Sequence, residues 1–485
     1  MPRIPSVLLA ALAVAAVPSA STAQPRPVGE PLHPAIRRPL IGPLVRPPPP
    51  SLPPPATDPT PAEPASPSQV PDVEDPAPRP PAAPLPAAQA PAPPPPAPPP
   101  APSPATPPPA EGDRDRATIT LSGWSDVYYA YNLNEPSNDV NSLRLYDARH
   151  NHIGFNSLAL DLNWRVETVS GHAIFQFGTL ASEFFYPAAD LARAQQELPW
   201  RILQEVTFAW APRIGGRQPL TFEGGIFVAP FGPEYIQIYK NWCWSASNLF
   251  YIAPFQLSGV RASWAVNDRW TVRAGVYSGW DQVLDDNNPG KSVLLQAEYA
   301  AGDDVFVSVQ YMVGAEHDRA AREGPWARHT LDAYGEFRVH ERVQLRAHVF
   351  AGVEPNRLGV NAWAAGALHA RVKLFDWLYV AGRGDFVVEW IPTYVERPAT
   401  ATRPAVTGVG ESLFGLPDAS PYGSGTGTIE FLPHRHLSLR LEFRHDGALG
   451  GLFYRGNVPV DAATRAPIFN AASQDTIAAG ATAWF

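Results

Sequence analysis

The chain has little sulfur and, outside its first residues, no long apolar stretch. Its 485 residues include two methionines and one cysteine, Cys243, which excludes an intramolecular disulfide. Beyond residue 23, no uninterrupted apolar segment reaches about 18 residues, so the sequence predicts no transmembrane helix there. The net charge of −9 disfavours nucleic acid as a partner. Cys243 stands between Trp242 and Trp244, a setting that favours a buried, unreactive thiol.

The first 23 residues have the pattern of an export signal. A basic residue, Arg3, precedes an apolar run from Val7 to Val17. The run ends in small residues up to Ala23, which is typical of a cleavage site. We therefore expect a signal peptide over residues 1–23, removed on export.

Residues 24–112 differ in composition from everything that follows. They contain no aromatic residue and hold 37 of the chain's 59 prolines. Because proline fixes φ and donates no backbone hydrogen bond, such a segment stays extended. We expect a disordered, Pro/Ala-rich periplasmic linker, which is either a plain spacer or an arm that contacts the cell wall.

From residue 113 the sequence alternates apolar and polar residues. The segment 437–444 reads Leu-Ser-Leu-Arg-Leu-Glu-Phe-Arg, and 330–339 and 343–350 follow the same period of two. This period predicts strands with one apolar and one polar face. The pattern fits either a soluble β-sandwich with its apolar faces inside, or a membrane barrel with its apolar face toward lipid.

Connection lengths decide between these two folds. Short connections at 267–269, 302–304, 340–342, 375–377 and 433–436 alternate with long ones at 181–200, 230–251, 391–422 and 448–473. Outer-membrane barrels alternate short periplasmic turns with long outer loops. We therefore predict an all-β fold over 113–485, a transmembrane antiparallel up-and-down β-barrel of about 16 strands. The strands are expected at 118–131, 152–166, 171–180, 201–211, 219–229, 255–266, 270–281, 291–301, 305–315, 328–339, 343–353, 362–374, 378–390, 423–432, 437–447 and 475–485.

Aromatic residues support this assignment. Indole rings prefer the membrane interface, and six tryptophans fall near the ends of strands that meet short turns, or near the chain end. They are Trp164, Trp210, Trp264, Trp270, Trp377 and Trp484. The final residue, Phe485, resembles the terminal residue of bacterial outer-membrane barrels. It would share a lipid-facing side with Ala483, Ala481, Ala479 and Ile477.

Two segments also carry a family resemblance. The residues concerned are Gly123-Trp124-Ser125-Asp126-Val127-Tyr128-Tyr129, Gly225-Ile226-Phe227, Phe231-Gly232-Pro233-Glu234, Asn241, Ser245, Phe250, Pro254-Phe255 and Gly259-Val260-Arg261. In this order they resemble the OmpL-like β-barrel porins, also called porin-2, over 117–485. The resemblance implies an outer-membrane channel but does not identify a solute.

The polar faces of the expected strands carry many charges, which would be costly against lipid and therefore predict a wet interior. The predicted pore-lining residues are Glu223, Arg261, Arg273, Asp332, Glu336, Arg338, Arg346, Arg371, Lys373, Arg383, Asp385, Glu389, Arg440, Glu442 and Arg444. Alternatively, these charges pair with each other and plug the barrel. The aromatic loop 230–251 either folds into the lumen as a constriction or caps the outer rim. Its constriction candidates are Glu234, Lys240, Trp242 and Trp244.

No enzymatic, metal or cofactor motif stands out. The acidic segment 281–288 lacks the spacing of a calcium loop, and His445-Asp446 is a weak basis for a hydrolase. We expect a non-enzymatic porin-like channel in the outer membrane that allows passive diffusion of small hydrophilic solutes. The alternatives are a structural barrel that links membrane to cell wall and, less favoured, a hydrolase. Expected partners are outer-membrane lipid, the solutes and further copies of the chain.

Overall fold

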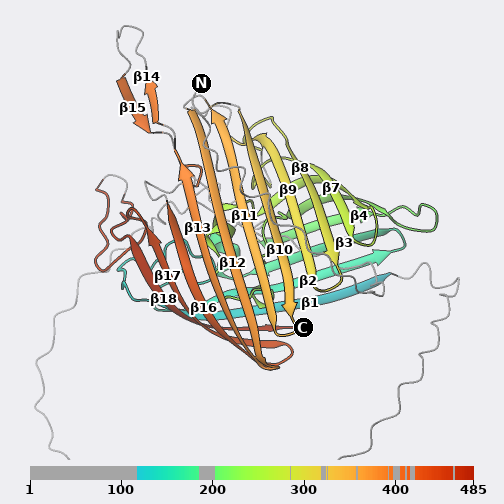
Figure 1. Ribbon diagram of the computed structural model, residues 1–485, viewed down its shortest axis with the longest axis horizontal. Coiled ribbons are helices and arrows are strands. Elements are labelled where there is room, and N and C mark those ends of the chain that lie inside the picture. The colour runs from blue at the N-terminus through green and yellow to red at the C-terminus, as the bar shows by residue number, and fades with distance from the viewer. Residues whose placement is uncertain are drawn as a thin grey trace, which may run out of the picture. The chain divides into compact units, whose positions relative to one another are not determined.

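Sixteen strands close into one antiparallel barrel, in the order β1-β18-β17-β16-β13-β12-β11-β10-β9-β8-β7-β6-β5-β4-β3-β2. Figure 1 shows these strands tilted side by side around the wall in a computed structural model. The structure describes residues 117–184, 202–283, 286–317, 324, 326–356, 359–391, 393–396, 405–409, 412–414, 421–462 and 465–485. The signal peptide and the linker predicted over 1–112 lie outside these described residues.

The strand bounds follow the chain in simple up-and-down order. The first eight strands are β1 (Thr118–Asn132), β2 (His152–Val166), β3 (Val169–Phe177), β4 (Leu203–Trp210), β5 (Leu220–Val228), β6 (Gln256–Ala265), β7 (Trp270–Tyr277) and β8 (Ser292–Ala301). The other eight barrel strands are β9 (Val305–Ala315), β10 (Ala327–His340), β11 (Val343–Asn356), β12 (Gly359–Phe375), β13 (Leu378–Trp390), β16 (Tyr422–His434), β17 (Leu437–Ala448) and β18 (Ser473–Trp484). The last strand closes the ring by pairing with the first, with Trp124 opposite Trp484.

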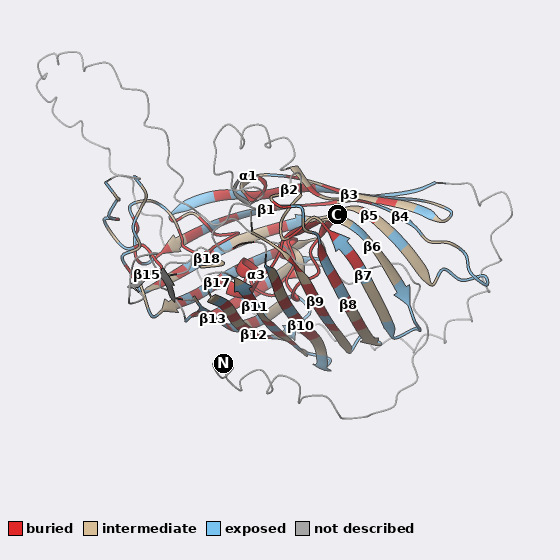
Figure 2. Cartoon of the chain, turned by 90° about the horizontal axis from the view of Figure 1, so that it is seen from above, coloured by how far each residue is buried: buried red, intermediate tan, exposed pale blue. Residues whose placement is uncertain are grey.

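Burial along the strands is inverted relative to a soluble protein. In β17 the polar residues Arg440, Glu442 and Arg444 are buried, whereas Leu441 and Phe443 are each 49% exposed. Figure 2 shows the same alternation of buried and exposed residues along neighbouring strands. An apolar outer face and a polar inner face are what a barrel in lipid requires. This finding excludes the soluble sandwich.

The predicted strands are confirmed in number and in place. Most boundaries agree within about three residues, because the period-two pattern is local to each strand. The largest shift is at β7, which ends at Tyr277 rather than at 281. The expected connection 391–422 contains a further hairpin, β14 (Thr393–Glu396) with β15 (Ala405–Val409), which the sequence analysis missed.

The helical elements among the described residues are short. They are α1 (Thr179–Phe184), the 3-10 helix η4 (Ile238–Lys240) and α3 (Asn248–Ile252). Ser247 caps α3, since its hydroxyl accepts a hydrogen bond from the Phe250 N–H. Among the described residues, no helix has both the length and the apolar character needed to cross a membrane.

The expected girdle at the short-turn end holds for five of its six tryptophans. Trp164, Trp210, Trp264, Trp270 and Trp377 are between 38% and 51% exposed. Trp484 is an exception, because its ring stacks on Tyr239 with the centroids 4.8 Å apart. Trp484 lies between Ala483 and Phe485, which face outward, so the alternation along the strand turns the Trp484 side chain toward the interior.

Candidate functional site: the barrel interior

The long loop between β5 and β6, residues 229–255, fills much of the barrel interior. It leaves the outward end of β5, and its carbonyl at Ile238 accepts a hydrogen bond (2.8 Å) from Arg440, three residues from the short-turn end of β17. The loop therefore descends through most of the barrel's depth. The expectation that it folds into the lumen agrees with this path, and the rim-cap alternative does not.

Arg383 on β13 is one of the strongest anchors of this loop. Its guanidinium donates to the carbonyls of Ser245 (2.5 Å) and Ala246 (3.1 Å) and to Glu234 (3.2 Å). It also donates to Asp385 on its own strand (3.2 Å). The side chain has no exposed surface. A buried guanidinium is tolerable only when its donors are satisfied, and the loop supplies most of these acceptors.

Strand β17 holds the same loop by charges of both signs. Glu442 accepts hydrogen bonds from the backbone N–H groups of Trp244 (2.6 Å) and Ser245 (2.9 Å). Arg444 donates to the carbonyl of Ala246 (2.5 Å). Charged inner-face residues of β17 thus replace water as partners of the loop backbone.

Glycines provide the room that the loop needs. Trp244 lies against Gly480 on β18, where an added Cβ would overlap its indole ring. Gly232 within the loop has φ of +74°, and an added Cβ there would lie 2.6 Å from the imidazole of His348. Any side chain at either position would therefore separate the loop from the wall.

A second loop, between β1 and β2, also enters the barrel, and the sequence analysis missed it. Residues 141–148 are all buried. Arg144 donates to Asp446 (2.5 Å) and to Thr476 (2.9 Å), while Tyr146 donates to the carbonyl of Tyr235 (2.8 Å). The available signal was weak, because this segment has fewer aromatic residues than 230–251.

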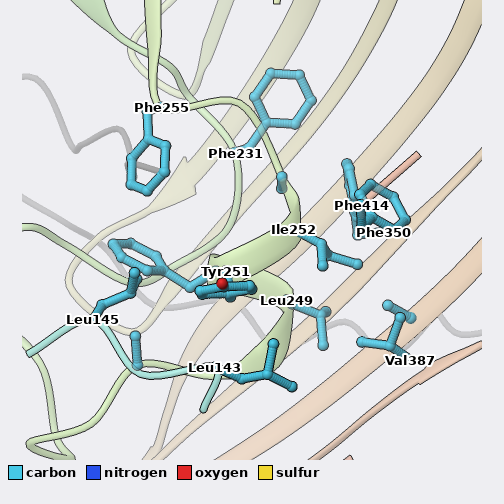
Figure 3. Packing of buried hydrophobic residues seen from close by; sticks show 14 of the residues in the cluster. Leu143, Leu145, Phe231, Leu249, Tyr251, Ile252, Phe255, Phe350, Val387 and Phe414 are labelled. Carbon is cyan, nitrogen blue, oxygen red and sulfur yellow. The ribbon is translucent and has the colours of Figure 1, made fainter. Parts of the chain in front are cut away.

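The two loops share one apolar cluster inside the outward half of the barrel. Figure 3 shows side chains from both loops packed against the wall. The labelled residues are Leu143, Leu145, Phe231, Leu249, Tyr251, Ile252, Phe255, Phe350, Val387 and Phe414. An apolar core within a polar-faced barrel means that the loops fill this half by packing as well as by hydrogen bonds.

The 15 predicted pore-lining residues divide into three groups according to their exposure. Eight are buried, namely Asp332, Arg346, Arg383, Asp385, Glu389, Arg440, Glu442 and Arg444. Six keep partial exposure, namely Glu223, Arg261, Arg273, Glu336, Arg371 and Lys373. Arg338 is exposed and lies 3.4 Å from Asp304 at a short turn. Among the constriction candidates, Glu234, Trp242 and Trp244 are buried and Lys240 is partly exposed.

Accessible inner-face charges lie on both sides of the ring. Glu336, Arg371 and Lys373 lie on β10 and β12, and a set of ion pairs lies on the wall from β2 to β8. The two ring nitrogens of His172 lie 2.9 Å from Asp161 and 3.7 Å from Glu205. Arg261 binds Glu223 at 2.7 Å, and Arg273 pairs with Glu298 on the neighbouring strand. Side chains in these pairs are 10–27% exposed. By contrast, side chains are 4% exposed or less in the ion pairs on β13, β16 and β17, which are Arg383–Asp385, Arg440–Glu430 and Arg444–Asp446.

Near the short turns, most inner-face charges on β2–β5 are of opposite sign to most of those on β10–β13. In a ring of sixteen strands, β2–β5 lie eight strands from β10–β13. The first group carries the carboxylates Asp161, Glu205 and Glu223, and the second carries the cations Arg346, Arg371, Lys373 and Arg383. All lie within a few residues of the short-turn ends of their strands. The cations on β10–β13 are partly balanced by carboxylates of the same wall, since Glu336 lies 3.3 Å from Arg346 and Asp385 lies 3.2 Å from Arg383.

The weaker chemical candidates have structural roles. Asp281 accepts a hydrogen bond from the Gln256 N–H (3.0 Å), and Asp286 pairs with Lys291. His445 and Asp446 are adjacent on β17 and therefore point to opposite faces. His445 contacts Asp475 (2.8 Å), whereas Asp446 binds Arg444 inside the barrel. His445 and Asp446 therefore do not act as a pair, and His445 has Asp475 as its partner instead.

Cys243 lies within the anchored loop and is fully enclosed. Burial raises the pKa of its thiol to about 11, with nearby Arg383 opposing that rise. At neutral pH the group stays protonated and is therefore a poor nucleophile.

A closed barrel with an apolar outer face, a charged inner face and an inward-folded loop defines an outer-membrane barrel of the porin class. The family model described as "Putative beta-barrel porin-2, OmpL-like" matches residues 118–485. The chain belongs to this family, so the resemblance inferred from its sequence motifs is confirmed. No curated protein matches the chain.

Several solved structures have a similar fold at low identity. OmpT of Vibrio cholerae, folded in vitro, is 10% identical, with 76% of this chain and 98% of that chain covered, and a TM-score of 0.47. The anion-selective porin from Comamonas acidovorans is 11% identical, with 76% and 100% covered and a TM-score of 0.47. The outer-membrane channel DcaP of Acinetobacter baumannii is 9% identical, with 76% and 97% covered and a TM-score of 0.47.

Proposed function

We propose that this protein is a narrow outer-membrane channel that lets small hydrophilic solutes diffuse passively. The observation that carries the proposal is the set of ionisable side chains on the inner face that stay accessible beside the in-folded loop 229–255. Charges kept inside a lipid-facing cylinder are costly unless water reaches them. Opposite walls of unlike charge would orient water and polar solutes as they pass.

In this proposal, loop 229–255 forms the constriction, with Glu234, Lys240, Trp242 and Trp244 among its residues. The burial of Glu234, Trp242 and Trp244 supports a fixed obstacle on one side of the interior. The remaining predicted pore-lining residues on β5–β7, Glu223, Arg261 and Arg273, would face the solute.

Single-channel recording of the full mature chain in planar bilayers tests this function. We expect steady ohmic current, and we expect a larger conductance after residues 236–248 are replaced by a short glycine linker. Heat-modifiable gel mobility would show that each variant is folded. An unchanged conductance in the folded loop variant would rule out the constriction.

A structural barrel without transport is the second candidate, and one observation favours it. In the outward half, inner-face residues on all sides of the ring are buried, for example Gln176, Met312, Phe350 and Thr476. If the folded wild-type protein carries no current in bilayers, this candidate replaces the channel.

The location of the remaining parts belongs to the same proposal. Residues 1–23 would direct export and be removed, and 24–112 would form a periplasmic linker that spaces the barrel from, or attaches it to, the cell wall. An association of several copies would follow the habit of porin folds, which is an analogy of fold alone.

A further inference from the structure

The buried inner-face amides of the outward half fall into two kinds. Gln474 on β18 is fully buried, and its amide donates to the carbonyl of Ser142 (2.8 Å) and to Asp446 (3.3 Å). Gln310 on β9 is likewise bonded to the carbonyl of Pro230 (2.6 Å). On β9 and β18, carbonyl groups of the in-folded loops therefore accept hydrogen bonds from the buried amides of the wall.

The wall at β3 and β4 is different. Gln176 and Gln204 have no exposed surface, and neither the amide nitrogen nor the amide oxygen of either side chain has a hydrogen-bond partner. On the adjacent β2, the amide nitrogen of Asn156 is likewise unpartnered. A buried amide that makes no hydrogen bond is destabilising, so such groups are normally hydrated.

These amides continue the accessible charged wall toward the outer end. Along β3 the inner-face residues are His172, Ile174 and Gln176, in that order from the short-turn end. His172 belongs to the accessible group with Asp161 and Glu205. An unpartnered amide and a paired imidazole thus lie on either side of Ile174 along one strand.

From these observations we infer that the solute path through the outward half follows β2–β4, past Gln176 and Gln204, and then reaches His172, Asp161 and Glu205. The inference rests on the proposed channel function and adds the route and the residues that select solutes. The amides favour uncharged or weakly charged solutes that hydrogen bond. The buried ion pairs of β13, β16 and β17 hold the loop and do not select.

Cysteine substitution at matched glutamines tests the route. Gln176 and Gln474 are both inner-face residues, both fully buried, and each is one residue from the outward end of its strand. The probe is a trimethylammonium methanethiosulfonate reagent, applied to the folded full-length protein in detergent and read by mass spectrometry. The wild-type protein gives the background from Cys243.

We expect Gln176→Cys to be labelled and Gln474→Cys to stay unlabelled while folded. In bilayers the same reagent should remove most of the current of Gln176→Cys alone, and a reducing agent should restore it. Gln204→Cys is the second variant, in case the first does not fold. Equal labelling of the β3 and β18 positions, or no labelling at Gln176 and Gln204, overturns the route.

Labelling does not depend on conduction, so the two proposals fail separately. A wild-type protein without current but with Gln176→Cys labelled would remove the channel and leave a hydrated cavity at β2–β4. Current without labelling at either glutamine would leave the channel and remove this route.

Discussion

At the scale of single residues, shape decides where the loops can lie. Trp244 can approach β18 because position 480 is a glycine, and an added Cβ would overlap its ring. Gly427, an exposed position on β16, has no such role. An added Cβ at Gly427 on β16 would meet nothing within 4 Å.

We therefore expect Gly480→Val to destabilise the protein and Gly427→Val to be tolerated. Valine at 480 must displace Trp244, and overpacking typically costs about 1–3 kcal/mol. The measurement is the temperature at which the folded band disappears in heat-modifiable gels. Equal temperatures for the two variants would contradict the role assigned to Gly480.

The thiol of Cys243 gives a prediction that depends on pH. Because its pKa is raised to about 11, the protonated form dominates up to that pH, and only the thiolate reacts. Folded protein should resist maleimide at pH 8, while urea-unfolded protein should react at once. Rapid labelling of the folded protein would show that Cys243 is accessible.

At the scale of elements, the loop 229–255 behaves as part of the wall. Its backbone supplies acceptors to Arg383, Arg440 and Arg444 and donors to Glu442. These contacts join positions 138 to 202 residues apart in sequence, the largest separation being that of Arg440 and Ile238. Side chains that a strand pattern presents as water-facing are in this way covered by the loop.

Substitution of Arg383 by glutamine should release this loop. It removes the charge between Glu234 and Asp385, and breaking a buried ion pair costs about 3–5 kcal/mol. Arg435→Gln, in an exposed short turn, is the control. Tryptophan fluorescence and heat-modifiable mobility should both change for Arg383→Gln only, and a stability equal to that of the control would argue against the anchor.

At the scale of the whole molecule, the barrel is complete without the first 117 residues. The ring begins with Thr118 in β1 and closes on β18 through pairs such as Tyr131 with Ile477. The family match likewise begins at residue 118.

Removal of 24–112, with the export signal kept, should leave a folded barrel in the membrane fraction. Heat-modifiable mobility and bilayer conductance should match those of the full chain. A variant that is exported but never shows the folded band would mean that the linker is needed for assembly.

The sequence by itself determined the strands, their inner and outer faces and the even strand number. Each of these depends on a local period of two, and Leu441 beside Glu442 already assigns its strand's faces. The sequence also indicated that the loop with Trp242 and Trp244 is too aromatic for a solvated loop, but it left open whether the loop enters the lumen or caps the rim. Only the tertiary structure decided which charged side chains of the inner face stay exposed to solvent. Asp385 and Glu223 have the same strand pattern, but loop 229–255 covers one and leaves the other partly exposed. Contacts between segments distant in sequence cause that difference, and the alternation of residues along a single strand does not predict such contacts.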